Sequence, residues 1–183
     1  MKKIIFLTLL FITISSHSQS VEYTVGNNNT NMQDNFYLKD NNNLLNKFVG
    51  TWKFEQNGKS LEITLQKVIK VPVGDSFQDE LQGTLIYKEN NVEIVNTNNL
   101  PLNDNGFYGD GISNVDPNKI KLFFRDPGRP KVSCVVYLNY SSYMNNVKKL
   151  DWKLIGVALL PFEENEVAPI DIRVIKECVL TKQ

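Results

Sequence analysis

The chain has 183 residues, of which 20 are basic and 20 acidic, and it contains two cysteines and one histidine. The balanced charge gives no electrostatic reason to expect binding to nucleic acid or to an anionic membrane surface. The length is sufficient for one domain with a hydrophobic core, and two cysteines are too few for a four-cysteine cluster.

The first residues have the three parts of a secretory signal peptide. Lys2 and Lys3 form a positive start, residues 4–14 are apolar except for two threonines, and small or polar residues follow. We therefore predict a signal peptide over residues 1–18, cleaved after Ser18 or Ser20, and export to the periplasm or out of the cell. The apolar run is shorter than the roughly 20 residues that span a bilayer, and no later segment is long and apolar enough, so we expect no membrane span after cleavage.

The position of the single histidine limits the chemistry of the protein. His17 lies in the segment that cleavage removes, so the mature chain has no histidine. Serine–histidine and cysteine–histidine catalysis lose their usual base, and most metal sites lose their commonest ligand. We therefore predict no catalytic residues, no metal site and no cofactor, and a protein that is not an enzyme.

Two polar clusters could be taken for cation or catalytic sites. Residues 103–105 with Asp110 resemble part of a calcium loop, but the full spacing and the closing glutamate are missing. Glu163, Glu164 and Glu166 lie in a proline-flanked stretch, where acidic side chains are usually solvated. We interpret the first cluster as a turn and the second as exposed surface.

Residues 19–46 form an asparagine-rich lead-in with few apolar side chains, which we expect to be extended and weakly ordered. Near its end, Asp40 is placed to cap a short helical turn that carries Leu44, Leu45 and Phe48. The sequence therefore predicts one turn of helix immediately before the first strand.

From residue 47 to residue 183 apolar and polar residues alternate with the period of a β-strand, interrupted by turn pairs such as Asn57-Gly58. Eight or nine short strands without a long helical pattern predict an all-β fold, and sequential hairpins favour a single antiparallel up-and-down β-barrel. The expected strands cover residues 51–55, 61–71, 81–87, 92 onward, 107–113, 119–125, 132–140, 150–154 and 170–180.

The run Gly50-Thr51-Trp52 opens the first of these strands. Its position after a helical turn resembles the start of the lipocalins and related calycin barrels. That resemblance implies a barrel whose base is closed by Trp52, with a basic residue from the last strand or just after it packed on the ring. Arg173 and Lys182 are both possible counterparts.

A second resemblance covers more of the chain. Residues 37–40, residues 43–53 and residues 79–83 resemble an uncharacterised family of small exported proteins in Bacteroidota. This resemblance implies a fold and a compartment but no activity and no site.

A barrel of this size can hold one small apolar ligand, and this is our leading hypothesis for the function. The first alternative is a solid-core module that binds other proteins at the cell envelope, through loops such as residues 96–106 and 161–169. The second is a hydrolase that uses only carboxylates. The side chains that we expect to bind the ligand face the barrel interior and are Trp52, Phe54, Tyr87, Phe124, Tyr140 and Trp152. We assign no role to Ile63.

Cys134 and Cys178 both lie on the apolar side of expected strands. In the oxidising compartment that an exported protein meets, they could form a disulfide. They could equally be two buried thiols that behave as small apolar side chains. The sequence leaves both alternatives open, because it does not show whether the two residues are adjacent.

Overall fold

The computed structural model describes residues 20–29, 31–100, 106–113, 115–129, 132–143, 146–159 and 172–183. The predicted signal peptide over residues 1–18 lies outside these ranges, as do residues 103–105, the side chain of Asp110, and residues 163–166. Our interpretations of those segments stay predictions.

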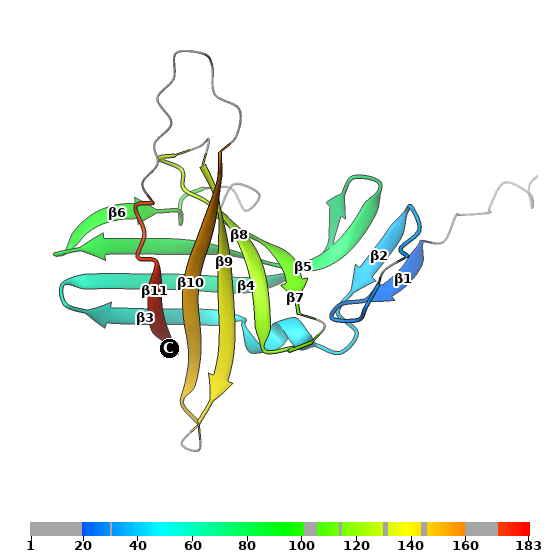
Figure 1. Cartoon of the computed structure of the whole chain (residues 1–183), viewed down its shortest axis with the longest axis horizontal. Coiled ribbons are helices and arrows are strands. Elements are labelled where there is room, and N and C mark those ends of the chain that lie inside the picture. The colour runs from blue at the N-terminus through cyan, green and yellow to red at the C-terminus, as the bar shows by residue number, and fades with distance from the viewer. Residues whose placement is uncertain are drawn as a thin grey trace, which may run out of the picture.

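Eight antiparallel strands close into a barrel (Figure 1), which confirms the predicted all-β, up-and-down architecture. Each strand pairs with the next one along the ring, and the ring closes where the last strand pairs with the first. The strands are β3 (Gly50–Gln56), β4 (Lys59–Val73), β5 (Ser76–Glu89), β7 (Phe107–Ile112), β8 (Lys119–Arg125), β9 (Val132–Ser142), β10 (Lys148–Leu159) and β11 (Glu177–Lys182).

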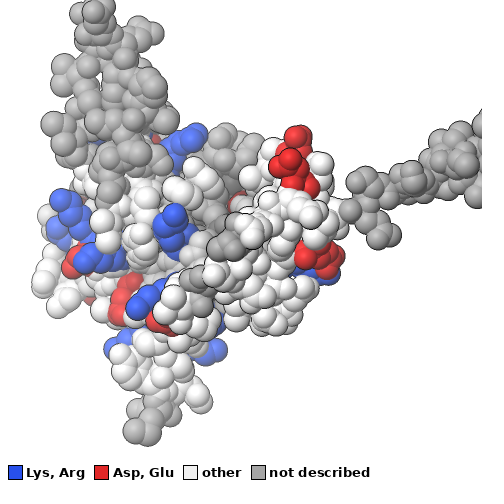
Figure 2. Space-filling view, turned by 45° about the vertical axis from the view of Figure 1, so that its right-hand side comes forward, with Lys and Arg blue, Asp and Glu red and all other residues white. Residues whose placement is uncertain are grey.

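One further strand, β6 (Val92–Asn96), shares a position in the ring with β7. The end of β5 pairs with β6, whereas its middle, at Leu81–Gly83, pairs with β7. The two short strands therefore follow one another along the same edge of β5. In Figure 1, β3–β6 run across the view and β7–β11 cross in front of them. Figure 2 shows Lys and Arg side chains spread over the barrel surface.

The two-residue period of the sequence matches the burial of the strands. In β4, Leu61, Ile63 and Leu65 are buried, whereas the residues between them face outward and are more exposed. Asn57 and Gly58 both have positive φ, 53° and 72°, in the turn between β3 and β4. That conformation is the one that an Asn-Gly hairpin turn requires.

The lead-in is more regular than its composition indicates. It contains β1 (Val21–Thr24) and β2 (Phe36–Lys39), which pair in parallel, and β2 also pairs in parallel with the start of β5. The tip of the β4–β5 hairpin extends beyond the barrel and supplies this edge (Figure 1). A sequence without strand periodicity forms strands here because a tertiary neighbour provides the hydrogen-bonding partners.

The helical turn before the barrel is η1 (Leu44–Lys47), a 3-10 turn. The carboxylate of Asp40 accepts hydrogen bonds from the backbone N–H groups of Leu44, at 2.7 Å, and Leu45, at 3.1 Å. The predicted turn is therefore confirmed. Asn43 occupies the N-cap position without a side-chain bond, and Asp40, three positions earlier, accepts the hydrogen bonds from the first turn.

The last strand is shorter than predicted. We expected it over residues 170–180, but β11 begins at Glu177, and residues 172–176 are not in a strand. Apolar and polar residues alternate here because Val174 is buried at one end of the barrel, whereas its neighbour Arg173 binds the carboxylate of Asp126. An alternating pattern of burial was therefore misread as a continuation of the strand.

Candidate functional site: the barrel interior and the Asp40–Asp79 junction

Trp52 lies at one end of the barrel interior and is completely buried. Its indole N–H donates a hydrogen bond to the backbone oxygen of Phe48, at 2.8 Å. The ammonium group of Lys182 lies 5.1 Å from the centre of the indole ring and donates to the backbone oxygen of Val49, at 2.7 Å. Burial, together with nearby Lys148, lowers the pKa of Lys182. Of the two basic residues considered for this ring, Lys182 is therefore the one that packs on it.

Arg173 lies at the opposite end of the barrel. Its guanidinium donates two hydrogen bonds to the carboxylate of Asp126, one of them at 2.7 Å, and a third to the backbone oxygen of Ile94, at 3.1 Å. Asp126 follows β8 and Ile94 lies in β6, so the ion pair ties residues 172–176 to the end of β8 and the third hydrogen bond ties them to β6.

Ring contacts fill the interior between these two ends. Phe107 contacts Phe124 and Trp152, with ring centres 5.2 Å and 5.8 Å apart, and Tyr140 contacts Trp52, at 6.3 Å. The indole N–H of Trp152 donates to the backbone oxygen of Ile175, at 2.8 Å. These distances are those of packed aromatic pairs.

The side chains that we expected to line a ligand cavity are mostly part of this packed core. Trp52 and Phe124 have 0 % relative exposure, and Tyr87 and Trp152 have 1 %. A void wide enough for water would leave accessible area on the side chains that line it, so none borders these four. Phe54 and Tyr140 are partly buried against the same core.

Both ends of the barrel are covered by the chain itself. At the Trp52 end, Leu45 of η1 and Phe48 are completely buried. At the other end, Val174 is buried, and the Arg173–Asp126 ion pair holds its segment in place. A ligand would have to displace one of these covers to reach the described interior.

A hollow bordered by described residues lies in the barrel wall. The pairing of β3 with β11 covers only Trp52–Lys182 and Lys53–Thr181, followed by a hydrogen bond from the N–H of Gln183 to the backbone oxygen of Thr51. In the other direction, beyond Lys53–Thr181, the two strands separate. The hollow between them has a volume of about 480 Å³ and is bordered by Phe54, among other residues. Of the six side chains expected to bind a ligand, Phe54 is the one that borders a hollow among the described residues.

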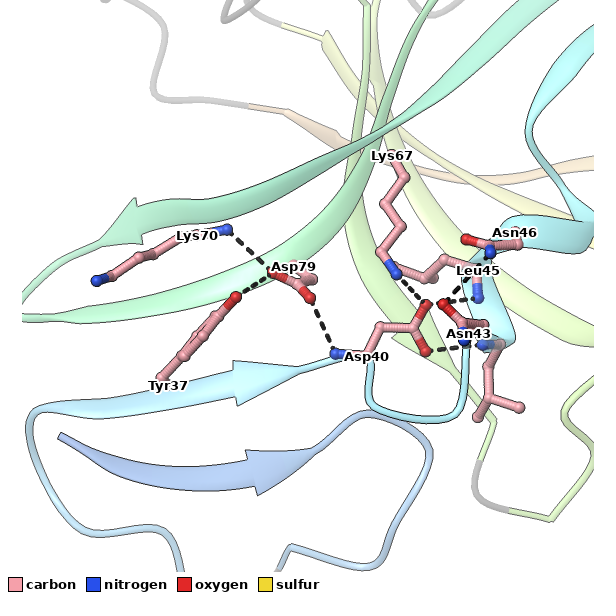
Figure 3. Close-up of polar contacts among 9 residues, drawn as sticks. Tyr37, Asp40, Asn43, Leu45, Asn46, Lys67, Lys70 and Asp79 are labelled. Carbon is pink, nitrogen blue, oxygen red and sulfur yellow. Dashed lines mark hydrogen bonds and ion pairs between the residues drawn. The ribbon is translucent and has the colours of Figure 1, made fainter.

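A second cluster of polar groups joins the lead-in to the barrel (Figure 3). The carboxylate of Asp79, on β5, accepts hydrogen bonds from the hydroxyl of Tyr37, at 2.7 Å, and from the backbone N–H groups of Asp40 and Lys70, both at 3.0 Å. The carboxylate of Asp40 accepts one from Lys67, at 2.8 Å, in addition to the two from η1. We call this cluster the Asp40–Asp79 junction.

The protonation of the junction follows from these bonds. Burial alone would raise the pKa of Asp79, but the hydrogen bonds from Tyr37 and the two N–H groups outweigh it, and the net pKa is lowered. Burial, with the hydrogen bond to the Asp79 carboxylate, raises the pKa of Tyr37 to about 12. Asp79 is therefore ionised and Tyr37 is neutral over the ordinary range of pH.

The junction brings two buried acids together, so it is one test of a carboxylate-only mechanism. Glu55 and Glu177 border the hollow between β3 and β11, and each forms an ion pair with a lysine. Both Asp40 and Asp79 are buried, and each carboxylate already accepts three hydrogen bonds from the protein. A general acid needs a raised pKa, whereas that of Asp79 is lowered. The arrangement fits a structural clamp.

Two sequence runs could have indicated this clamp. Tyr37 and Asp40 lie in residues 37–40, and Asp79 opens residues 79–83; both runs carried the resemblance to a family of exported proteins. The partnership itself was not visible, because Asp40 and Asp79 are 39 positions apart.

Cys134 and Cys178 are free thiols in the structure. They lie on β9 and β11, the two neighbours of β10, where Cys134 is opposite Val157 and Cys178 opposite Trp152. Two strand spacings and five residues along β10 separate their Cα atoms by roughly 20 Å, far beyond disulfide reach. The possible disulfide is therefore not formed. Burial raises the pKa of Cys134 to about 11 and that of Cys178 to about 12.

Within the described ranges, no group of three or more His, Cys, Asp or Glu side chains lies close enough to hold a metal ion. Among the same residues, no helix has the length and apolar character needed to cross a membrane.

The fold and its packing define a class of protein: a closed, eight-stranded antiparallel barrel with a packed core and a short strand pair clamped to its side. The chain belongs to a family of unknown function, DUF6705, whose model matches residues 1–183. Searches of curated proteins and of solved structures find no match to this chain.

Proposed function

We propose that this chain is an exported, non-catalytic β-barrel that binds another protein at the cell envelope through its outer surface. The observation that carries the proposal is the packed interior. Ligand sites in proteins are preformed hollows of roughly 300–1,000 Å³, whereas Trp52, Phe124 and their neighbours are packed against one another beneath covered barrel ends. This observation favours the solid-core alternative over a ligand held inside the barrel.

Export and the lack of catalysis have separate support. Export rests on the positive start and short apolar run of residues 1–18. The lack of catalysis rests on the position of His17 in that segment, and on the Asp40–Asp79 junction, where both carboxylates are saturated with protein donors.

Native mass spectrometry of the mature protein tests the packed interior. We expect the mass of the polypeptide alone, and no change in tryptophan fluorescence when long-chain fatty acids are added, because Trp52 and Trp152 are already enclosed by protein. A small molecule that co-purifies in a one-to-one ratio and quenches this fluorescence would overturn the proposal.

The hollow between β3 and β11 favours a second candidate, a small apolar ligand bound from the side. Phe54 and Cys178 border the hollow, but Lys53, Glu55 and Glu177 do so as well. If a ligand binds there, Phe54→Ala will change its affinity, whereas Phe124→Leu in the closed core will not. Equal effects of the two substitutions would argue against this location.

A further inference from the structure

Four apolar side chains form a row on the outside of the barrel. Tyr108 of β7 is paired with Phe123 of β8, Phe123 with Val135 of β9, and Val135 with Ile155 of β10. Directly paired residues share a face of a sheet, and Phe124 and Cys134, the next residues along, face the core. The row therefore faces outward on four consecutive strands.

The row is exposed at its two ends, whereas Phe123 and Val135 between them are half-buried. Tyr108 is 38 % exposed and Ile155 is 43 % exposed, and the rings of Tyr108 and Phe123 are stacked with their centres 5.5 Å apart. Tyr137, in the adjacent row, is 42 % exposed. Single exposed apolar residues are normal on protein surfaces, but a continuous group is characteristic of a contact site.

Basic side chains border this row. Tyr137 is paired with Lys121 on one side and with Lys153 on the other, and Lys121 lies 5.2 Å from the ring centre of Phe123. The outward positions of β8–β10 carry five basic residues against one acidic residue, Asp151; the basic ones are Lys119, Lys121, Arg125, Lys149 and Lys153.

Two acids at the margin reduce this excess without removing it. Asp116 pairs with Lys119, at 3.3 Å, and Glu177 pairs with Lys153, at 3.0 Å. The chain as a whole has equal numbers of basic and acidic residues. Positive charge is thus concentrated on the outward positions of β8–β10, beside the apolar row. Figure 2 shows Lys and Arg on the barrel surface, with Asp and Glu next to some of them.

We propose that this face, called here the β7–β10 face, binds an extended acidic segment of a partner protein that has apolar residues at alternate positions. The inference rests on the proposed function and names the surface and the partner chemistry. Four strands about 4.8 Å apart span roughly 14 Å, the length of about four or five extended residues. Successive side chains of such a segment point to opposite sides of its backbone. When the backbone lies on its edge between the apolar row and the adjacent row of Lys121, Tyr137 and Lys153, the apolar side chains meet the first row and the acids reach the lysines of the second.

The aliphatic members of the row distinguish a peptide from a nucleic acid strand. Proteins that bind single-stranded nucleic acid stack the bases on flat aromatic rings. The row has two such rings, Tyr108 and Phe123, and they are stacked on each other. Val135 and Ile155 have no flat ring. They offer instead the branched surface that packs against apolar side chains.

The test uses a synthetic peptide of about eight residues in which Glu alternates with Val and Phe, and a matched peptide with Gln in place of Glu. Fluorescence anisotropy in low salt should detect binding of the acidic peptide, at least tenfold tighter than that of the Gln peptide. Raising the salt concentration should weaken it, because screening acts on exposed charges. Backbone NMR shifts should be confined to β7–β10.

Variants locate the site. Lys121→Glu should weaken binding about tenfold and Ile155→Ala about threefold, because one reverses a bordering charge and the other removes part of the apolar row. The matched controls are Lys88→Glu on β5 and Val92→Ala on β6, which lie outside β7–β10 and should leave the affinity unchanged. Circular dichroism checks that each variant is folded, and Arg125→Glu replaces Lys121→Glu if that variant is not.

Three results would overturn the inference: equal affinity for the two peptides, equal effects of the site and control variants, or tighter binding of a single-stranded oligonucleotide than of the acidic peptide. Failure of the proposed function looks different, because it appears as a small molecule in the native mass spectrum. That result leaves the peptide measurement unaffected.

Discussion

Two regions attach the residues before β3 to the barrel, and they do so with different chemistry. At the barrel end, Trp52 and Phe48 pack in the core beneath Lys182, so the attachment is mostly apolar. At the barrel side, the hydrogen bonds of the Asp40–Asp79 junction hold β2 against β5, and an ion pair joins Asp40 to Lys67 of β4. The first region therefore contributes to the stability of the whole barrel, whereas the second stabilises only the attachment of β1 and β2 to its side.

The largest effect is expected from Trp52→Ala. The substitution removes a completely buried indole and the hydrogen bond to Phe48, so the free energy of unfolding should fall by about 3–5 kcal/mol. Urea denaturation followed by circular dichroism measures it. Val92→Ala, at an exposed position, is the control and should stay within about 0.5 kcal/mol. A loss below about 1 kcal/mol for Trp52→Ala would show that this end is not part of the core.

Asp79→Ala should have a smaller and more local effect. It leaves the Tyr37 hydroxyl and the N–H groups of Asp40 and Lys70 without their acceptor, at about 1–3 kcal/mol. Hydrogen exchange should become faster in β1 and β2 while the protection of β8–β10 is retained. Uniformly faster exchange throughout the barrel would contradict the distinction between the two regions.

Acid should weaken the junction before it affects the apolar end. The pKa of Asp79 is lowered in the folded state, so its stabilising contribution is complete above the unfolded value, about 3.9, and is lost as pH falls through the folded value. In Asp79→Asn, the decline of stability below about pH 4 should therefore be shallower than in the parent protein. Thermal denaturation between about pH 2 and pH 6 measures it, and parallel curves would be the contrary result.

The smallest effect is expected from Lys182→Met, which keeps the length of the side chain and its contact with Trp52. It removes the charge over the indole ring and the hydrogen bond to Val49, together worth about 1 kcal/mol. Urea denaturation compares it with Lys148→Met, a nearby lysine without these contacts, for which we expect no measurable loss. A larger loss of unfolding free energy for Lys148→Met than for Lys182→Met would contradict the assignment of Lys182 to the indole ring.

The two regions also differ in how well the sequence predicts them. The alternation of Leu61, Ile63 and Leu65 follows from strand geometry, and Gly50-Thr51-Trp52 indicated the end of the barrel, because these signals are local. The choice of Lys182 over Arg173 required the arrangement of the last strand. The contact of Asp40 with Asp79 required the extension of the β4–β5 hairpin, which no local pattern describes.

The candidate site was predicted less well than the fold. Trp52, Tyr87, Phe124 and Trp152 were correctly expected to face inward, but an inward position does not distinguish a cavity wall from a packed core. Whether a void remains depends on the volumes of facing side chains from distant strands. That sum is a property of the assembled barrel and cannot be obtained from strand periodicity.

The short pairing of β3 with β11 has a consequence for the rate of folding. The barrel closes through contacts such as that between Lys182 and Val49, which are 133 positions apart, so closure carries the entropic cost of a very long loop. Contacts of this separation form late and slowly in single domains. Until β11 is in place, β3 and β10 each present an open edge, so the interval before closure is when the chain is most susceptible to aggregation.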